Sequence, residues 1–406
     1  MRIALAVHKR AAIRAAIFSL VVSALGATAS NAAMQMTPAN ANESALAARA
    51  DGTFAAVPEV HGRTKTFRLV AREAQWTLRS GVTAAARTYN GVVPGPTLVV
   101  NQGDRVVIDF TNELDVPDTI HLHGIHGAPP EMDGVAGISQ PLVAPHGTFR
   151  YEFTANEDGT FLYHSHSNEA VLDSGLYGGI IVEPAHPRAV ERGLSGDYLE
   201  ILSAWQLGGG PEDHFTINGK EYPETRQIEV RRGDRVRIRW INISSENEHT
   251  MHSHGHDQRV IARDARPVPD GDVEDTVMIG PGQRVDVVVT ADAIPGTWIV
   301  HCHFLDHTQD QQGMPSGLIT ALHYRGTPNV FAAMDESMRI DMPAMMQPSM
   351  HGAPQAAPFR PSRRVLLALI VALAAAICVG VLAVRRLRAS RRRILAAERG
   401  RRLRRP

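Results

Sequence analysis

Potential metal ligands crowd the segment His301-Cys302-His303-Phe304-Leu305-Asp306-His307, and Gly313-Met314 follows it. Side chains alternate between the two faces of a β-strand, so His301 and His303 share one face and Cys302 points to the other. One short strand can therefore serve two metal sites on opposite sides of its backbone. A cysteine thiolate with His307 and a weak ligand such as methionine is the donor set of a blue-copper site.

Histidine pairs separated by one residue occur at four places in the chain. Each pair puts two imidazoles on one face of a strand, which is how a β-scaffold directs nitrogen ligands to a common point. The pairs are His121/His123, His164/His166, His252/His254 and His301/His303. One such pair alone is more often a hydrogen-bonded surface pair than a ligand pair. Four pairs, accompanied by Cys302, His249 and His307, indicate metal binding.

The histidine motifs belong to an internal duplication. His252-Ser253-His254-Gly255 repeats His121-Leu122-His123-Gly124 at an offset of 131 residues (252 − 121). The run from Gly296 to His303 repeats the run from Gly159 to His166 at an offset of 137 (296 − 159). A repeat unit of about 130 residues with short Val/Ile-rich runs between Gly, Pro and Asn signals is typical of a β-sandwich. In this alignment Cys302 corresponds to Ser165, so only the second unit can form a thiolate site.

Zinc and copper are the two metals to weigh. A structural zinc site usually needs four ligands with paired cysteines, whereas this chain offers eight paired histidines and a single cysteine among them. Imidazole with one thiolate favours copper, and His249, Cys302 and His307 form the His₂Cys set of a blue-copper site.

These motifs, in this order, resemble those of the two-domain multicopper oxidases, close to the bacterial small laccases, over residues 62–326. The resemblance implies an all-β fold of two cupredoxin-like Greek-key β-sandwich domains. It also implies about four coppers per chain, as type 1, type 2 and binuclear type 3 centres. The implied reaction couples one-electron oxidation of a reducing substrate to four-electron reduction of O₂ to water.

The resemblance also assigns ligands. The type 1 copper resembles one held by His249, Cys302 and His307, with Met314 as a weak axial ligand. His121 and His252 correspond to type 2 ligands. The type 3 ligands correspond to His123, His164, His166, His254, His301 and His303. In such relatives the trinuclear cluster lies between the first domain of one subunit and the second domain of its neighbour, which implies a homotrimer.

The axial position departs from the family pattern. The family usually places the axial residue ten positions after the cysteine, which here is Gln312, and Met314 comes two residues later. Either a bulged loop lets Met314 bind, or Gln312 takes the position, since glutamine is a known weak axial ligand. We favour Met314, because relatives with longer loops keep the Gly-Met ending.

Two residues are candidate catalytic groups. By resemblance to laccases, His307 is the exposed ligand at which substrate electrons enter. Asp133 in Met132-Asp133-Gly134 matches a family acid that supplies protons near the cluster. An Asp before Gly is equally typical of a simple turn.

Charge is segregated along the chain. Residues 34–362 carry 25 basic and 41 acidic side chains, a net charge of −16 (25 − 41), which argues against nucleic-acid binding. Residues 385–406 instead carry eleven Arg and one Glu. The other cysteine, Cys378, lies in an apolar run, so a disulfide framework is excluded.

Both ends have the features of targeting or anchoring segments. A basic start, an apolar stretch and small residues predict a signal peptide over residues 1–33. Residues 365–384 are uncharged and long enough for a transmembrane helix, and the Arg-rich tail after it is expected in the cytoplasm. The catalytic domains are then expected on the periplasmic side of the plasma (inner) membrane.

The expected domain organisation follows from these signals. It comprises a signal peptide (1–33), a flexible leader (34–61), domain 1 (62–186), domain 2 with the type 1 copper (195–326), a Met-rich linker (327–362), a transmembrane helix (365–384) and a basic cytoplasmic tail (385–406).

Several reducing substrates fit this organisation. A laccase-like oxidase acts on phenolic or aromatic compounds. A cuprous oxidase that protects the envelope acts on Cu(I), which the thioethers of Met334, Met338, Met342, Met345, Met346 and Met350 would suit. A linker that is merely rich in Ala, Pro and Met explains the same composition. A copper nitrite reductase fits less well, because its blue-copper cysteine belongs in the first domain, where this chain has Ser165.

Overall fold

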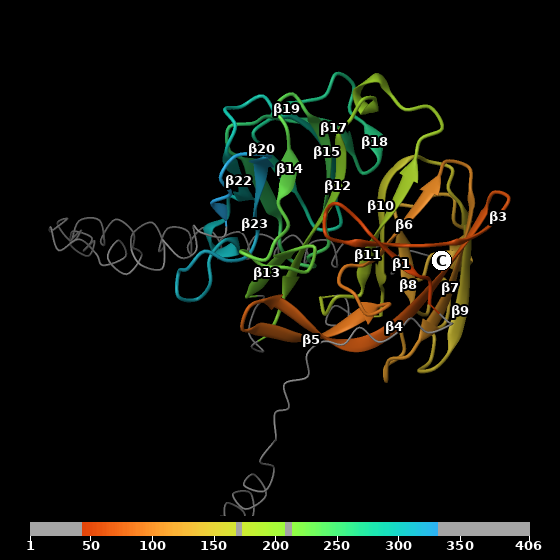
Figure 1. Ribbon diagram of the computed structural model, residues 1–406. Helices are drawn as coiled ribbons and strands as arrows, with labels where there is room; N and C mark the ends of the chain where they lie inside the picture. The colour runs from red at the N-terminus through yellow and green to blue at the C-terminus, as the bar shows by residue number, and fades with distance from the viewer. Residues whose placement is uncertain (1–42, 168–172, 208–212, 332–406) are drawn as a thin grey trace, which may run out of the picture. The chain divides into compact units, whose positions relative to one another are not determined.

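The computed structural model describes residues 43–167, 173–207 and 213–331. These residues form strands and short 3-10 helices, arranged as two successive β-sandwich domains (Figure 1). The prediction of an all-β fold is confirmed. The predicted signal peptide, Met-rich linker, transmembrane helix and basic tail lie outside the described residues.

Domain 1 is built from two sheets. One has the strand order β1-β2-β6-β11-β10-β8, and the other has the order β3-β4-β7-β9 with β5 paired to β4. The strands are β1 (Leu46–Ala48), β2 (Phe54–Ala56), β3 (Glu59–His61), β4 (Thr64–Arg79), β5 (Val82–Tyr89), β6 (Gly95–Asn101), β7 (Arg105–Asn112), β8 (Ile120–His123), β9 (Thr148–Thr154), β10 (Gly159–Ser165) and β11 (Tyr177–Glu183). The 3-10 helix η2 (Pro130–Met132) follows β8. Alternating residues of the two sheets, including Phe67, Ile108, Tyr151 and Ile180, fill the core between them.

Domain 2 repeats this plan. Its sheets have the orders β13-β12-β15-β21-β17-β18, with β19 paired to β17, and β14-β23-β22-β16-β20. The strands are β12 (Gly196–Trp205), β13 (His214–Ile217), β14 (Ile228–Val230), β15 (Arg235–Asn242), β16 (His249–Ser253), β17 (Gln258–Arg263), β18 (Arg266–Pro267), β19 (Val273–Glu274), β20 (Thr276–Ile279), β21 (Arg284–Thr290), β22 (Thr297–Cys302) and β23 (Ile319–Tyr324). The 3-10 helices are η3 (Ala189–Glu191), between the domains, and η4 (Leu305–His307). Cys302 is fully buried in this second core.

Strand register shows how similar the two domains are. His121 of β8 lies opposite His164 of β10, and His252 of β16 lies opposite His301 of β22. One residue further, Ile120 pairs with Ser165 as Met251 pairs with Cys302. The repeat read from the sequence is therefore a repeat of backbone pairing.

The segment before domain 1 differs from expectation. The prediction of a flexible leader over 34–61 is wrong for residues 43–61, which form β1, β2 and β3. Ser44 donates its backbone N–H to Arg68, and buried Asp51 accepts a hydrogen bond from the backbone N–H of Leu199 at 3.0 Å. These contacts lie far apart along the chain, so composition alone could not reveal them.

The two domains share an apolar interface. Trp76, Tyr177 and Leu162 of domain 1 pack with residues of domain 2 that include Trp205 and Ile241. The second half of the long strand β4 runs beside domain 2, as Figure 1 shows near β13, and the indole Nε1 of Trp76 donates to the carbonyl of Gly219 at 2.7 Å.

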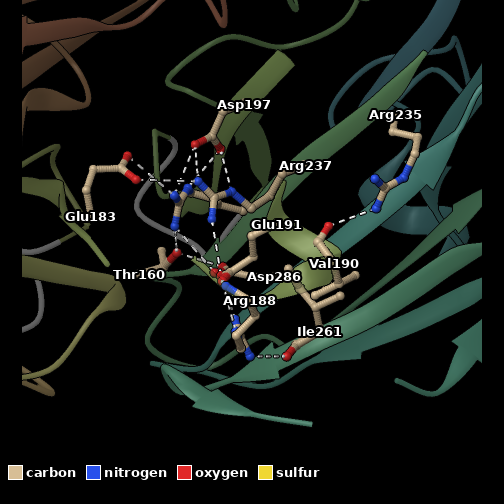
Figure 2. A network of polar contacts seen from close by, with 11 residues as sticks. Thr160, Glu183, Arg188, Val190, Glu191, Asp197, Arg235, Arg237, Ile261 and Asp286 are labelled. Carbon is tan, nitrogen blue, oxygen red and sulfur yellow. Dashed lines mark hydrogen bonds and ion pairs between the residues drawn. The ribbon is translucent and has the colours of Figure 1, made fainter. Parts of the chain in front are cut away.

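A buried ion network joins the domains beside this interface (Figure 2). The guanidinium of Arg239 is 1% exposed and contacts Asp197 at 2.8 Å and Asp286 at 3.4 Å. The same guanidinium donates to the hydroxyl of Thr160 in domain 1 at 2.7 Å, and that hydroxyl donates to Asp286 at 2.6 Å. Because every charge has an opposite partner, burial of the network is tolerated.

No helix in the described residues is long and apolar enough to cross a membrane.

Replacing Asp197 by Asn tests this network. Burial opposes ionisation of Asp197, but Arg239 and Arg237 outweigh it and lower the pKa to about 2. A depressed carboxyl pKa stabilises the fold above the unfolded pKa near 3.8, and that contribution is lost as the pH falls toward 2. We expect Asp197→Asn to lower the free energy of unfolding at pH 7 by roughly 2 kcal/mol, measured by urea titration.

The difference from wild type should shrink as the pH falls below the unfolded pKa. Asp109, which pairs with Arg150 on the surface, supplies a matched control, and Asp109→Asn should leave stability nearly unchanged. An equal loss in both variants, or a loss that grows in acid, contradicts the assignment.

Candidate metal centres

The first candidate centre gathers His249, Cys302 and His307. Their ligand atoms all lie within 4.8 Å of one another, and all three residues are buried. The two Nδ1 atoms of the histidines are 3.1 Å apart, and Sγ of Cys302 is 3.4 Å from Nδ1 of His307. Three residues from β16, the end of β22 and η4 thus present two imidazole nitrogens and one thiol to a single point.

Neighbouring side chains fix the orientation of these ligands. Ser244 lies 2.9 Å from Nε2 of His249, which leaves Nδ1 for a metal. The ring of Phe215 packs on the ring of His307 with centroids 4.0 Å apart. His307 is only 5% exposed, so the expectation that it is an exposed ligand is wrong. Phe215 covers the ring and shields it from solvent.

Burial sets the protonation states at this centre. It lowers the pKa of His249 to about 3, with a further contribution from His307, and it also lowers the pKa of His307. Both imidazoles are therefore neutral near pH 7, which is the form that binds a metal. Burial raises the pKa of the Cys302 thiol, so metal binding there must displace a proton.

The loop after His307 forms a small hairpin. The N–H of Leu318 donates to the carbonyl of His307. Gln309 and Pro315 pair in an isolated antiparallel β-bridge. Within the turn, the carboxylate of Asp310 accepts hydrogen bonds from the N–H groups of Gln312 at 3.0 Å and Met314 at 2.9 Å. Gln312 is exposed near the tip of the hairpin, whereas Met314 is half-buried on its returning arm. This difference favours Met314 for the axial position.

A second group of ligands lies in domain 1. His121, His123 and His164 have ligand atoms within 4.8 Å of one another, and the ring of His166 lies 5.3 Å from that of His121. Nδ1 of His121 and of His164 each point to a backbone carbonyl, at 2.6 Å and 2.8 Å. Their Nε2 atoms are thereby free for a metal. Burial lowers the pKa of His164 to about 3 and that of His123 to about 4.

Domain 2 carries the matching group. Nε2 of His254 lies 3.1 Å from Nε2 of His301, and the rings of His252 and His303 are 5.8 Å apart. Nδ1 of His301 contacts the carbonyl of Cys302 at 2.8 Å, just as His164 contacts Ser165. The strand alternation expected for His301, Cys302 and His303 is observed, because Cys302 lies in the core on the side opposite these histidines.

The two histidine groups are separate within one chain. Among the described residues, every short histidine–histidine contact falls within one domain. The domain 1 group opens on a cavity whose other walls are Ile243, Ser244, Ser245, Pro281 and Gly282 of domain 2. None of these five is one of the domain 2 histidines.

Asp133 lies beside the domain 1 group. Its backbone carbonyl accepts the hydrogen bond from Nδ1 of His121, and its carboxylate Oδ1 is 3.4 Å from the same nitrogen. The carboxylate is 47% exposed. Gly134 has φ +80°, and a Cβ there would lie 1.9 Å from the carbonyl oxygen of Ile120. Only glycine allows this turn to approach His121 so closely.

The sequence pattern identified Ser165 as the domain 1 counterpart of Cys302, but the counterpart of His249 was missed. At the offset of 131, Asp118 occupies the position of His249 (249 − 131), and Ser165 occupies that of Cys302. The hydroxyl of Ser165 donates to Asp118 at 2.5 Å, and Asp118 is fully buried. Burial raises the pKa of Asp118. A polar pair therefore fills the place that the metal ligands occupy in domain 2, and the offset alone could have identified Asp118.

Comparisons with known proteins agree with this geometry. Two family models, both described as multicopper oxidase, match residues 70–187 and 199–317. The blue copper oxidase of Nitrosomonas europaea is 32% identical, with a TM-score of 0.60 over 67% of this chain and 93% of that chain. The multicopper oxidase mgLAC is also 32% identical, with a TM-score of 0.62 and the same coverage.

Curated relatives are longer. Laccase-2 of Botryotinia fuckeliana is 31% identical over 254 residues, which cover 55% of this chain and 43% of the laccase. The chain thus spans less than half the length of that relative.

The thiolate centre is tested by Cys302→Ser. The change is nearly isosteric, but a serine hydroxyl is a poor ligand where a thiolate is needed. We expect the variant to fold, to lose any intense blue absorption and to bind about one copper fewer per chain than wild type. Ser165→Ala is the matched control at the equivalent position of domain 1, and it should keep the blue band. A blue band that survives in Cys302→Ser contradicts the assignment.

Proposed function

Because this chain belongs to the multicopper oxidase family, we propose that it couples one-electron oxidation of a reducing substrate to the reduction of O₂ to water. The observation that carries the proposal is the position of Cys302. It contributes a thiol to one centre, while His301 and His303 on either side contribute imidazoles to the other. Copper is the cofactor, and the observed imidazole and thiol donors fit it.

Bound copper would supply one-electron chemistry at the type 1 centre and O₂ reduction at the trinuclear cluster. The residues of the chain do the rest. His249, Cys302 and His307, with Met314 as axial ligand, hold the type 1 copper in a water-excluded core. Cys302 joins that centre covalently to His301 and His303. Asp133, half-exposed beside His121, is placed to deliver protons to the cluster.

We assign the type 2 and type 3 ligands as the sequence predicts. His121 and His252 serve type 2 copper. The type 3 pair is bound by His123, His164, His166, His254, His301 and His303. The alternative reaction of a copper nitrite reductase is disfavoured, because Ser165 and Asp118 occupy the position at which domain 1 would need its thiolate centre.

The cluster is completed between chains in this proposal. Each domain offers four histidines in a separate half-site, and a ring of three chains would bring domain 1 of each subunit against domain 2 of the next. The separation of the half-sites within one chain supports a homotrimer.

Mixing two inactive variants tests this arrangement. His164→Ala damages only the domain 1 half-site, and His303→Ala damages only the domain 2 half-site. Co-refolded or co-expressed at equal amounts, they should regain about a quarter of wild-type activity, since one interface in four would join two intact halves. Each variant alone should stay inactive. If the cluster formed within one chain, the mixture would also stay inactive.

The reducing substrate is a phenolic or aromatic compound, or Cu(I). A cuprous oxidase dedicated to copper resistance in the envelope is the alternative to a broad laccase-like oxidase. The methionines between Met334 and Met350 support it by composition, because thioethers select Cu(I).

Deleting residues 334–351 separates these alternatives. If the methionines capture Cu(I), the deletion should weaken Cu(I) oxidation several-fold and leave phenol oxidation unchanged, as measured by O₂ uptake. Replacing the same methionines by leucine is the control for linker length. Equal effects on both substrates, or no effect, would remove the role in Cu(I) capture.

The location of the protein is part of the proposal. A signal peptide over residues 1–33 and a transmembrane helix over 365–384 would leave the two domains on the periplasmic side of the plasma (inner) membrane. The hydropathy and charge pattern of the sequence supports this orientation.

A further inference from the structure

A cavity of about 170 Å³ lies beside the type 1 centre. One wall is Arg79, at the end of β4 in domain 1, and another is His214-Phe215 on β13. Ser316 and Gly317, on the returning arm of the copper loop, also line it. The cavity therefore combines both domains with the loop that carries the type 1 ligands.

The cavity is only one layer of atoms from a copper ligand. Phe215, which lines it, packs on the ring of His307 at 4.0 Å. Gly317 also touches His307, because a Cβ at Gly317 would lie 2.2 Å from the His307 carbonyl oxygen. A small molecule in this cavity would lie within easy electron-transfer range of the buried His307 ring.

One wall of the cavity carries an oriented base. Nδ1 of His214 lies 2.6 Å from Oε1 of Glu221, and a carboxylate can only accept, so Nδ1 carries the hydrogen. The other oxygen of Glu221 accepts from Arg79 Nε at 2.8 Å and from Ser316 Oγ at 3.0 Å. Glu221 is 1% exposed and fully engaged. His214 is therefore fixed in the tautomer whose Nε2 accepts a proton.

Other charges face this histidine. Oδ1 of Asp213 is 4.0 Å from Nε2 of His214, and Asp310 pairs with Arg79 across the cavity. The hydrogen bond that His214 donates to Glu221 is the main cause of a raised pKa at His214, with added attraction from Glu221 and Asp213, while burial and Arg79 oppose it. A raised pKa makes the neutral imidazole a stronger proton acceptor.

We propose that His214 is a catalytic base for hydroxylated aromatic substrates that bind in this cavity. The inference rests on the proposed oxidase function and names the substrate class of its electron-entry site. Asp213, Glu221 and Asp310 line the cavity together with Arg79, so its charge does not exclude a cation. His214 is the feature that favours a phenol, because a phenol can stack on Phe215 and donate its O–H to Nε2 of His214, whereas a bare cation has no proton to give.

The reaction balances at this site. The phenol O–H bond breaks, its proton goes to Nε2 of His214 and one electron goes through His307 to the oxidised type 1 centre. The phenoxyl radical leaves, and His214 releases its proton to solvent. Four such events supply the four electrons that one O₂ takes up in the proposed reaction.

The test uses the copper-loaded protein and the variant His214→Gln. Glutamine keeps a hydrogen bond to Glu221 but is not a base. Two reductants are compared, 2-methoxyphenol and ferrocyanide, which carries no proton. We expect the ratio of kcat/KM for the phenol to that for ferrocyanide to fall by about a hundredfold. The wild-type phenol rate should rise with pH as His214 deprotonates, around a midpoint above 6.5, and this limb should vanish in the variant.

A binding measurement gives a readout apart from turnover. 4-Nitrophenol resists oxidation, and its absorption shows whether it is ionised. Bound to wild type, its phenolate form should pair with protonated His214 and release the phenol proton to solvent. Phenolate absorption should then appear at a pH where free 4-nitrophenol is still protonated. His214→Gln and a second variant, His214→Asn, should abolish this signal. His61→Gln, at an exposed histidine on β3, is the matched control and should behave like wild type.

Two outcomes overturn the proposal. One is phenolate absorption that persists in both His214 variants. The other is an equal loss of phenol and ferrocyanide oxidation, which would indicate damage to the copper loop rather than loss of a base. A wild-type protein without copper or blue absorption would instead refute the oxidase function, so the two failures are distinguishable.

Discussion

The alternation of side chains along β22 is the constraint on which the site depends. It forces Cys302 into the core of domain 2 and turns His301 toward the opposite side, where its Nε2 meets that of His254 at 3.1 Å. The thiol and the imidazoles are then neighbours in the chain but belong to different centres. A one-residue slip of β22 against β16 would exchange the two faces and destroy both centres. The pairing of His252 with His301 therefore fixes the function as well as the fold.

The duplication shows how the same backbone supports two outcomes. Domain 1 keeps the pairing of His121 with His164, so it keeps its half of the histidine cluster. At the buried positions behind those histidines it has Asp118 and Ser165, joined at 2.5 Å. A buried carboxyl with a short hydrogen bond replaces the metal ligands His249 and Cys302. Among the described residues the thiol therefore occurs only in the domain 2 centre, while both domains keep a group of four histidines.

The sequence predicted those features that depend on local period and repetition. Strand alternation placed the histidines, and the repeated motifs predicted the two β-sandwiches. Features that depend on tertiary contact were missed or wrong. The order of residues 43–61 depends on distant partners such as Arg68 and Leu199, and the burial of His307 depends on Phe215, 92 positions earlier (307 − 215). The hydrogen bond from His121 to the backbone carbonyl of Asp133 could not be predicted either, because every residue type has a backbone carbonyl. The 131-residue offset between the repeats could have identified Asp118 as the counterpart of His249.

The central claim is that copper binds at the His249, Cys302 and His307 site and at a cluster shared between neighbouring chains. A crystal structure with anomalous scattering recorded at the copper edge tests it most directly. We expect one peak within about 3 Å of the Cys302 sulfur, on the order of a copper–thiolate contact. It also predicts a group of peaks between the His164 side of one chain and the His301 side of its neighbour. Peaks confined to the half-sites of a single chain, or no peak beside Cys302, would contradict it.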